Sequence, residues 1–224
     1  KGVSPGALPD KPVLKWSFKV GDPIKSSAAI EGGLVFIGAD NGILYAIDLL
    51  TGKEKWQQTT DGMIESSPLV LGDRVFVGSS DGYLYAFEKA TGKPLWKYET
   101  DDQILGAPNW VKSPDGKSFW IVTGSYDYFL HCVDADTGKG VWKYETGNYI
   151  NGAPAISDGK TVFGGCDALL HVISLADGTK VNEIEAGAYI PGSAAMDGDR
   201  VYVGHYESEF LCFDLKEAAL KWTY

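Results

Sequence analysis

The sequence predicts an all-β fold in which one unit of four short strands is repeated five times. A tryptophan returns at nearly regular intervals, since Trp16, Trp56 and Trp96 are 40 residues apart, Trp142 follows after 46 and Trp222 ends the series. A Thr-Gly turn precedes most of these tryptophans. The composition, with 28 Gly and 12 Tyr among 224 residues, is typical of short strands joined by tight turns. A repeat of about 40 residues made of short apolar runs indicates a β-propeller of four-stranded antiparallel blades.

The repeats span about residues 17–56, 57–96, 97–142, 143–182 and 183–222, and we assign residues 1–224 to one propeller domain or propeller segment. Each repeat is expected to supply strands A, B, C and D. In the first repeat these lie at 26–30, at 34–37, at 43–49 and from the turn at Thr51-Gly52 to about Trp56. Asn41-Gly42 provides the hairpin turn between strands B and C. Six additional residues between Pro108 and Gly124 predict one longer turn in the third repeat.

Three columns of the repeat are interpreted as packing residues. An isoleucine opens strand A in every repeat, and a glycine ends strand B in every repeat. The tryptophan at a fixed place on each outer strand is expected to dock one blade against the next, although Asn182 stands where the fourth repeat should have it. The columns are Ile24, Ile64, Ile104, Ile150 and Ile190; Gly38, Gly78, Gly124, Gly164 and Gly204; and Trp16, Trp56, Trp96, Trp142 and Trp222.

Residues 13–19 align with the D strands, so the chain begins with a D strand that has no A, B or C strand before it. Propellers commonly close when a strand from one terminus completes the blade begun by the other. The unmatched strand favours a longer natural ring of six to eight blades, of which these residues are a part. A closed ring of five blades and a ring of several chains are the alternatives.

Charge and cysteine content exclude several classes of partner and site. Thirty acidic and twenty basic residues give a formal charge of −10, and without a Lys/Arg cluster nucleic acid is not an expected partner. No apolar run has the roughly 20 residues of a transmembrane helix. Cys132, Cys166 and Cys212 form no CxxC or adjacent pair, and two of them occupy a small, buried position of the repeat.

Candidate binding residues lie in the loops of one propeller mouth, because loops carry function while blades carry packing. Lys25, Glu65 and Asn151 each follow the isoleucine of their repeat, and Lys25 and Glu65 are spaced to form an ion pair between neighbouring blades. The turns between strands B and C consist of small polar residues in the first two repeats, whereas those of the third and fifth repeats contain tyrosine, histidine and acidic residues. The asymmetric candidates are Tyr126, Asp127, Tyr128, Tyr149, Tyr189, His205, Tyr206 and Glu207.

Two interpretations of these loop residues remain open. Tyrosines, a histidine and acids suit the stacking of a sugar or quinone ring or the anchoring of a protein partner. The same tyrosines could instead cap wider turns at the surface. His131 and His171 occupy the strand C position of Tyr45 and Tyr85 and are expected to be packed there. No spacing supports a nucleophile, a catalytic set or a metal site.

The recurring pattern Ala-x-Asp-x-x-Thr-Gly-Lys-x-x-Trp, read at residues 46–56, resembles the tryptophan-docking motif of the PQQ-like propeller repeat family. The likeness covers residues 13–224. The resemblance implies a bacterial, periplasmic or otherwise extracytoplasmic protein. Family members include quinoprotein dehydrogenases, which hold PQQ with calcium, and a scaffold of outer-membrane assembly.

The sequence lacks the neighbouring cysteines and the free tryptophan that the dehydrogenases of this family typically use, so no cofactor is expected. We therefore favour a non-catalytic binding or scaffold module that holds a protein or a small ligand at its loop mouth. The alternatives are a segment of a PQQ-dependent quinoprotein dehydrogenase, with PQQ and calcium, and an outer-membrane assembly scaffold. Fold alone does not decide between them.

Overall fold

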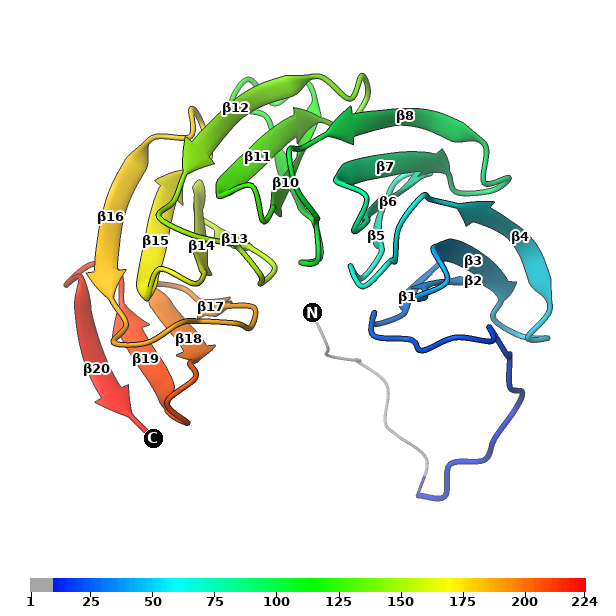
Figure 1. Cartoon of the computed structure of the whole chain (residues 1–224), viewed down its shortest axis with the longest axis horizontal. Coiled ribbons are helices and arrows are strands. Elements are labelled where there is room, and N and C mark those ends of the chain that lie inside the picture. Colours follow the sequence, from blue (N-terminus) through cyan, green and yellow to red (C-terminus); the bar gives the residue numbers. More distant parts are fainter. Residues whose placement is uncertain (1–9) are drawn as a thin grey trace.

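The computed structural model describes residues 10–224, and all of its regular structure is β. Twenty strands form five four-stranded antiparallel sheets, each from one repeat (Figure 1). Within every sheet the strands are paired in sequence order, from an inner strand A to an outer strand D. The predicted propeller of four-stranded blades is confirmed.

The strand bounds repeat closely from blade to blade. Blade 1 consists of β1 (Ala29–Glu31), β2 (Leu34–Gly38), β3 (Ile43–Asp48) and β4 (Glu54–Thr59). Blade 2 consists of β5 (Leu69–Leu71), β6 (Arg74–Gly78), β7 (Tyr83–Glu88) and β8 (Pro94–Glu99). Blade 3 consists of β9 (Asn109–Lys112), β10 (Phe119–Gly124), β11 (Phe129–Asp134) and β12 (Gly140–Glu145). Blade 4 consists of β13 (Ala155–Ser157), β14 (Lys160–Gly164), β15 (Leu169–Ser174) and β16 (Lys180–Glu185). Blade 5 consists of β17 (Ala195–Asp197), β18 (Arg200–Gly204), β19 (Phe210–Asp214) and β20 (Ala219–Thr223).

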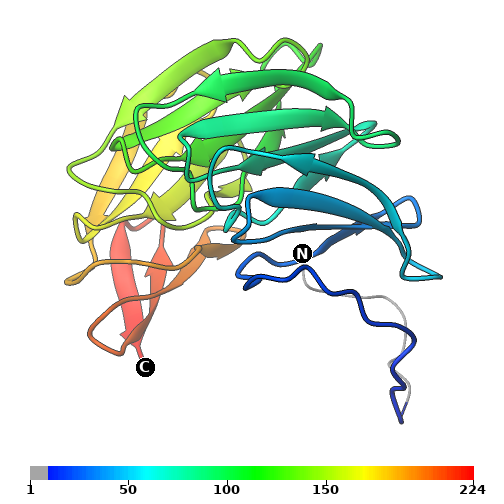
Figure 2. The same ribbon diagram turned by 45° about the vertical axis from the view of Figure 1, so that its right-hand side comes forward.

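The five sheets follow one another around an open arc. Figure 1 shows a gap between blade 1 and blade 5, and Figure 2 shows the sheets stacked face to face like a fan. A closed ring of five blades is therefore not the arrangement of residues 10–224. The cores lie in the seams between sheets: one cluster joins Phe36 and Leu44 of blade 1 to Val75 and Phe87 of blade 2.

Strand A of blade 1 is shorter than the predicted span of 26–30, because a side chain replaces the first part of the ladder. The Ser26 hydroxyl donates to the carbonyl of Gly38 at 2.8 Å and accepts from its N–H at 3.1 Å. Strand pairing then begins at Ala29. The inner strands are crowded, since a Cβ added to Gly106 would lie 2.7 Å from the carbonyl oxygen of Gly152. A Cβ on Gly152 would likewise lie 2.3 Å from the carbonyl oxygen of Gly192, so these two small residues near the axis are required by space, whereas nothing lies within 4 Å of a Cβ on Gly192.

A β-bulge just before each conserved tryptophan position shifts the register between strands C and D. In blade 1, Ala46 pairs with Trp56 whereas the next residue, Ile47, pairs with Glu54. The same shift occurs in all five blades. A bulge bends the outer strand and redirects the side chain beside it. The Trp56 indole N–H donates to the carbonyl of Lys89 in the next blade at 3.0 Å.

The recurring isoleucines and the recurring glycines contact each other across the seams between blades. A Cβ added to Gly38 would lie 2.1 Å from Cγ2 of Ile64, which belongs to the loop leading into the next blade. The same contact recurs at the three following seams: Gly78 with Ile104, Gly124 with Ile150, and Gly164 with Ile190. These four isoleucines are fully buried. They lie in the loops before strand A and do not open that strand, which corrects the predicted boundary.

Residues 13–19 do not form the predicted strand D. No strand is present between residues 10 and 28, and within residues 10–224 no strand C forms a β-ladder with this segment. Trp16 nevertheless docks as predicted, since its indole N–H donates to the carbonyl of Leu49 at 2.9 Å. Its ring leaves no room for a Cβ on Gly52, which would lie 2.6 Å from Cγ of the tryptophan. The docking contact therefore forms without a β-ladder.

The extra residues of the third repeat form one turn, as predicted. β9 and β10 are joined by residues 113–118, whereas two residues, Gly32 and Gly33, join β1 to β2. The Ser113 hydroxyl donates to Asp115 at 2.7 Å and accepts from the N–H of Ser118 at 3.0 Å. This turn lies at the end of the blades opposite the loops considered next.

Candidate functional site

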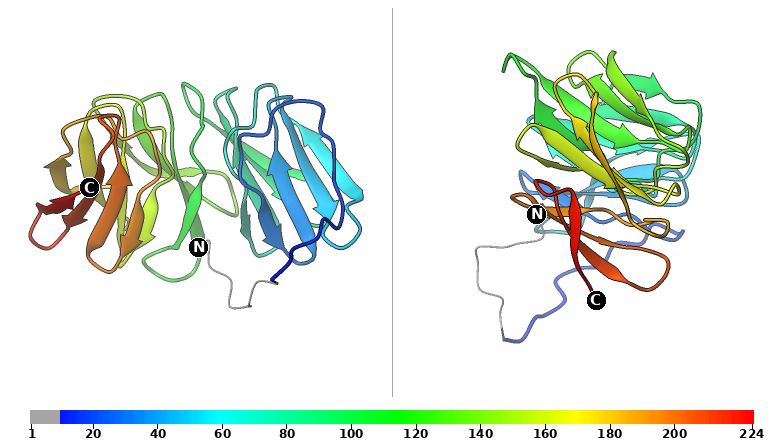
Figure 3. Two further views of the ribbon diagram at one scale, coloured as in Figure 1. Left: turned by 90° about the horizontal axis from the view of Figure 1, so that it is seen from below. Right: turned by 90° about the vertical axis from the view of Figure 1, so that its left-hand side faces the viewer.

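The B–C turns and the D–A loops meet at one end of the sheets, and we call this end the mouth rim. Figure 3 shows the propeller edge-on, with connecting loops gathered at both ends of the sheets. Backbone hydrogen bonds join each turn to the loop entering its blade. In blade 3 the Tyr126 N–H donates to the carbonyl of Gln103 at 2.9 Å, and in blade 4 the Cys166 N–H donates to the carbonyl of Tyr149 at 2.9 Å. The rim is therefore a connected surface.

In blades 1 and 2 the mouth rim holds an ion-pair group around its one lysine. The Lys25 ammonium lies 2.7 Å from a carboxylate oxygen of Glu65 and 3.1 Å from one of Asp40. Hydrogen bonds to Glu65 and then to Asp40 raise the pKa of Lys25 above its ordinary value. Lys25 and Glu65 therefore form the ion pair that their spacing predicted.

Three of the predicted tyrosines come together at the seam between blades 3 and 4. The rings of Tyr126 and Tyr149 are stacked with centroids 4.6 Å apart, and Tyr128 leans on Tyr149 at 5.2 Å. Tyr128 and Tyr149 are 40% and 38% exposed. Tyr128 also has φ = +75°, a conformation that costs a bulky residue free energy and occurs mostly where the surroundings impose it. We call Tyr126, Tyr128 and Tyr149 the tyrosine cluster.

Tyr126 is the most enclosed member of the tyrosine cluster, whereas Tyr128 and Tyr149 are exposed. The pKa of Tyr126 is raised above its ordinary value, chiefly by burial and then by the neighbouring groups of Cys166, Tyr206 and Glu65. Glu65 comes from the loop entering blade 2, and Tyr206 comes from blade 5. Tyr126 is thus within electrostatic reach of groups from three other blades.

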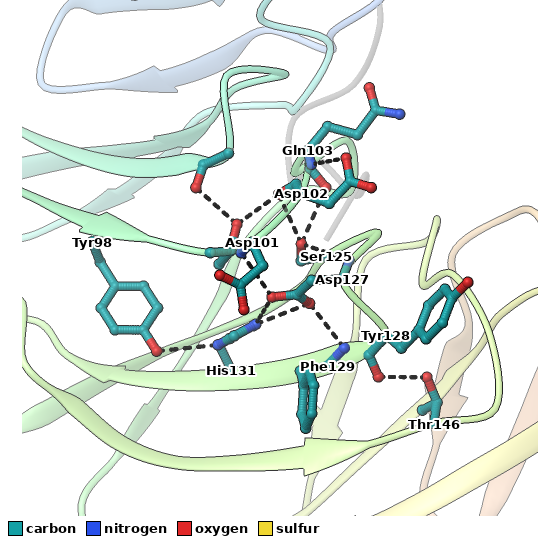
Figure 4. Close-up of polar contacts among 12 residues, drawn as sticks. Tyr98, Asp101, Asp102, Gln103, Ser125, Asp127, Tyr128, Phe129, His131 and Thr146 are labelled. Carbon is teal, nitrogen blue, oxygen red and sulfur yellow. Dashed lines mark hydrogen bonds and ion pairs between the residues drawn. The ribbon is translucent and has the colours of Figure 1, made fainter.

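Asp127 lies between two of these tyrosines in sequence but belongs to the interior. Its side chain is 3% exposed, and a carboxylate oxygen lies 2.9 Å from Nε2 of His131 (Figure 4). The Tyr98 hydroxyl lies 3.1 Å from Nδ1 of the same ring. Burial acts to raise the pKa of Asp127, but the hydrogen bond and charge of His131 and the N–H groups of Phe129 and Asp101 outweigh it and hold the pKa below its usual range. The Asp127 side chain, which the sequence placed among the binding residues of the mouth, is thus enclosed and paired with His131.

Related contacts recur in other blades, which identifies them as structural. The Tyr85 hydroxyl donates to Asp81 at 2.7 Å, and Nε2 of His171 lies 2.8 Å from Asp167. His131 and His171 are buried, as the sequence predicted for packed residues. Although tyrosine, histidine and aspartate are grouped as in some hydrolytic sites, the His131 and Asp127 side chains are too enclosed for a substrate to reach them.

Asn151 and the blade 5 residues are distributed differently. The Asn151 side-chain N–H lies 3.5 Å from Sγ of Cys166, and its Oδ1 is buried without a hydrogen-bond partner. Tyr189, Tyr206 and Glu207 line an open cavity of about 290 Å³ at the seam between blades 4 and 5. His205 is buried and accepts from the Glu207 N–H at Nδ1, so it is not part of this cavity.

The sequence did not predict a second concave surface on the inner wall of the arc. A cavity of about 910 Å³ is lined by residues of strands A and the loops before them, including Asn109, Trp110, Pro154 and Met196. Trp110 occupies the repeat position that Ile30 and Val70 occupy in blades 1 and 2, so a tryptophan replaces an aliphatic residue there. That replacement is the sequence signal that could have drawn attention to this wall.

Within residues 10–224, no group of three or more His, Cys, Asp or Glu side chains is placed to hold a metal ion. The same residues contain no helix that is long and apolar enough to cross a membrane.

Comparison with known proteins places the fold in a family. A family model described as outer membrane protein assembly factor BamB matches residues 13–124 and 111–181, which together make up more than half of the chain. The chain belongs to this family. The match confirms the resemblance to PQQ-like propellers on which the sequence interpretation relied.

Solved structures of this family's fold are similar over most of the chain. BamB from Moraxella catarrhalis superposes with a TM-score of 0.80 at 21% identity, over 94% of this chain and 64% of that one. The computationally designed Ika8 protein superposes with a TM-score of 0.77 at 19% identity, over 89% of this chain and 61% of that one. The chain thus spans less than two thirds of each structure, and at these identities the likeness shows the fold alone. The comparison with curated proteins found no match.

Proposed function

We propose that this chain is a non-catalytic scaffold of outer-membrane protein assembly and that it binds a protein partner at the mouth rim. The observation that carries the proposal is the tyrosine cluster: stacked, partly exposed rings that converge from two blades. Aromatic residues are enriched at the centres of protein interfaces because they bury a large rigid surface at a small entropic cost. A periplasmic or outer-membrane-associated location and a cofactor-free state are parts of the same proposal. The BamB family membership supports the assembly role.

Site-specific photo-cross-linking tests where a partner binds. A photoreactive phenylalanine analogue at position 128 of the full-length protein is expected to cross-link to a protein in the source organism. The same analogue at position 50, where Leu50 is 87% exposed in a C–D turn at the opposite end of the blades, serves as the control. Equal cross-linking from both positions, or none from position 128, would contradict binding at the mouth rim.

Loss of the gene tests the assembly role. We expect lower amounts of outer-membrane β-barrel proteins in a deletion strain, and recovery with the wild-type gene. A gene with Tyr126→Ser, Tyr128→Gly and Tyr149→Met should not restore them. These replacements copy Ser80, Gly82 and Met63, the residues at the corresponding positions of blade 2 and its entry loop, so the fold is retained. Unchanged barrel proteins in the deletion strain would contradict the assembly role.

A further inference from the structure

The charges of the mouth rim are almost all of one sign. The B–C turns, the D–A loops and the segment 20–28 contain eleven Asp and Glu residues but a single Lys or Arg, Lys25. Lys25 is already paired with Glu65 and Asp40. Asp127 and Asp167 are turned inward to their histidines. The remaining acids leave a strong negative potential over the mouth, which favours a positively charged partner and disfavours a nucleic acid.

Exposed acids of this set stand beside the tyrosine cluster. Asp101 and Asp102 are exposed in the loop entering blade 3 and have no ion-pair partner within residues 10–224. The negative charge of Asp102 is among the influences that raise the pKa of Tyr149, after the hydrogen bond and charge of Tyr128 and after burial. Figure 4 shows Asp101 and Asp102 in the loop next to the turn that carries Tyr128. The Asp101 N–H donates to Asp127 at 3.2 Å and the Tyr126 N–H donates to the carbonyl of Gln103 at 2.9 Å, so the loop with these carboxylates is fastened to the turn that carries two of the tyrosines.

Aromatic faces attract cations, because the ring quadrupole presents negative charge above and below its plane. The neighbouring strands of this protein already use the interaction. The Lys97 ammonium lies 4.0 Å from the centroid of the Tyr83 ring, and the Lys143 ammonium lies 4.2 Å from that of Phe129. The open rings of Tyr128 and Tyr149 have no cation of this chain over them in the described structure. They offer the same contact to a partner.

We propose that the mouth rim binds an extended, positively charged protein segment, whose arginine or lysine side chains lie on the tyrosine cluster with Asp101 and Asp102 beside them. The inference rests on the proposed function and names the chemistry of the partner. The cavity lined by Tyr189, Tyr206 and Glu207 repeats the combination of rings and a carboxylate one seam further on. A segment that crosses both seams could place a cation at each.

Peptide binding to the purified chain tests the chemistry. The probe is a fluorescein-labelled decapeptide of alternating Arg and Ser, followed by fluorescence anisotropy, and the comparison peptide has Gln in place of Arg. We expect the Arg peptide to bind at least about tenfold more tightly than the Gln peptide and to weaken as salt is added, since exposed charges are screened. Equal binding of the two peptides would overturn the proposal.

Two matched sets of variants locate the binding. Tyr126→Ser, Tyr128→Gly and Tyr149→Met together, and separately Asp101→Asn with Asp102→Asn, should each weaken the Arg peptide about tenfold or more. Asn148 stands at the position of Asp102 in the next loop, so an amide fits there. Glu31→Gln with Asp73→Asn removes the same charge from the opposite end of the blades and should leave binding nearly unchanged. An equal loss with this control would show that net charge alone attracts the peptide, and would overturn the site.

The two levels of the proposal fail separately. If position 128 cross-links to a protein but the Arg peptide does not bind, the cationic chemistry is wrong and the scaffold function stands. If the peptide binds as expected but position 128 captures no protein, the chemistry of the surface stands and the scaffold function fails. Circular dichroism of every variant checks that the β-sheets are intact.

Discussion

At the scale of single residues, one position of strand C is a tyrosine in blade 2 and a histidine in blade 3, and both side chains contact the aspartate of the preceding turn. Tyr85 donates its hydroxyl to Asp81, four residues earlier, whereas His131 approaches Asp127, also four residues earlier. Each aspartate also accepts an N–H from the loop of the preceding seam, as Asp127 does from Asp101. The aspartate therefore fastens its own turn and the adjacent loop at once. A buried carboxylate keeps its charge only because these donors surround it.

The pH dependence of stability should report this contact. The pKa values of Asp127 and Asp167 are lowered in the folded protein, so their stabilising contribution is complete above the ordinary pKa of aspartate, about 4, and is lost as the pH falls below it. Asp127→Asn should lower the free energy of unfolding by about 1–3 kcal/mol at pH 7. Its stability should then fall less than that of the wild type between pH 6 and pH 3, as measured by urea unfolding. Glu31→Gln, at an exposed site, is the control, and a parallel loss in Asp127→Asn would contradict the assignment.

At the scale of strands and seams, the tryptophan and the glycine of neighbouring blades depend on each other. A Cβ on Gly92, Gly138 or Gly178 would lie 2.6–2.7 Å from the ring of the tryptophan that docks there. The seam between blades 4 and 5 lacks both partners, since Asn182 of blade 4 replaces the tryptophan and Ala218 of blade 5 replaces the glycine. Ala218 retains the positive φ of the turn, at +51°. With no tryptophan against the turn, its Cβ is tolerated.

A double-mutant cycle tests this dependence. Asn182→Trp alone should place the indole against the Cβ of Ala218 and gain little or lose stability. Ala218→Gly alone should relieve the positive φ. Together they should recreate the docking contact, with a favourable coupling of about 1–3 kcal/mol in the free energy of unfolding, because residues in direct contact are not additive. Additive effects measured by denaturant unfolding would contradict the interpretation.

Much of the fold could be predicted from the sequence because each blade repeats local chemistry. Turn residues and alternating apolar runs located most strands to within a few residues, and the period of about 40 gave the blades. The prediction of a strand D at residues 13–19 was wrong because the repeat pattern gives only the local preference for that strand. A strand also needs a neighbouring strand with which to form hydrogen bonds. The isoleucine and glycine columns were each visible, but their contact crosses a seam and cannot be read from spacing along one chain.

The candidate site was predicted only in part for the same reason. Departures from the repeat drew attention to Tyr126, Tyr128 and Tyr149, which the fold brings together. They also drew attention to Asp127 and His205, whose side chains turn inward. Whether a turn residue points into the mouth or into a seam depends on the neighbouring blade. The sequence of one repeat does not contain that information.

At the scale of the whole molecule, the chain has a series of cores and no single centre. Four of the five buried clusters join neighbouring sheets, as when Phe76 and Leu84 of blade 2 meet Ile121 and Val133 of blade 3. The fifth packs blade 1 against residues 16–20. In such an arrangement stability is a sum of blade terms and nearest-neighbour terms. Blades 2, 3 and 4 have a neighbour on both faces, whereas blades 1 and 5 have a neighbouring sheet on one face in residues 10–224 (Figure 1).

Hydrogen exchange should reveal this gradient. In the chain of residues 1–224, amides of β6, β10 and β14 should exchange most slowly, and those of β18 should exchange faster although β18 has the same length as β6. Ile104→Ala, which removes the side chain over Gly78, should raise exchange mainly in blades 2 and 3. Mass spectrometry of peptic fragments measures both effects. Uniform protection of all five sheets would contradict a series of separately stabilised seams.

The isoleucine that covers the glycine of the neighbouring blade also couples the mouth rim to the packing of two sheets. Tyr149 of the tyrosine cluster is followed directly by Ile150, whose side chain fills the space over Gly124 in blade 3. A segment that immobilises Tyr149 would thereby restrain the joint between two sheets. A partner bound at the mouth rim would then slow the separation of blades 3 and 4, including their outer strands. The other pairs of blades would separate at unchanged rates.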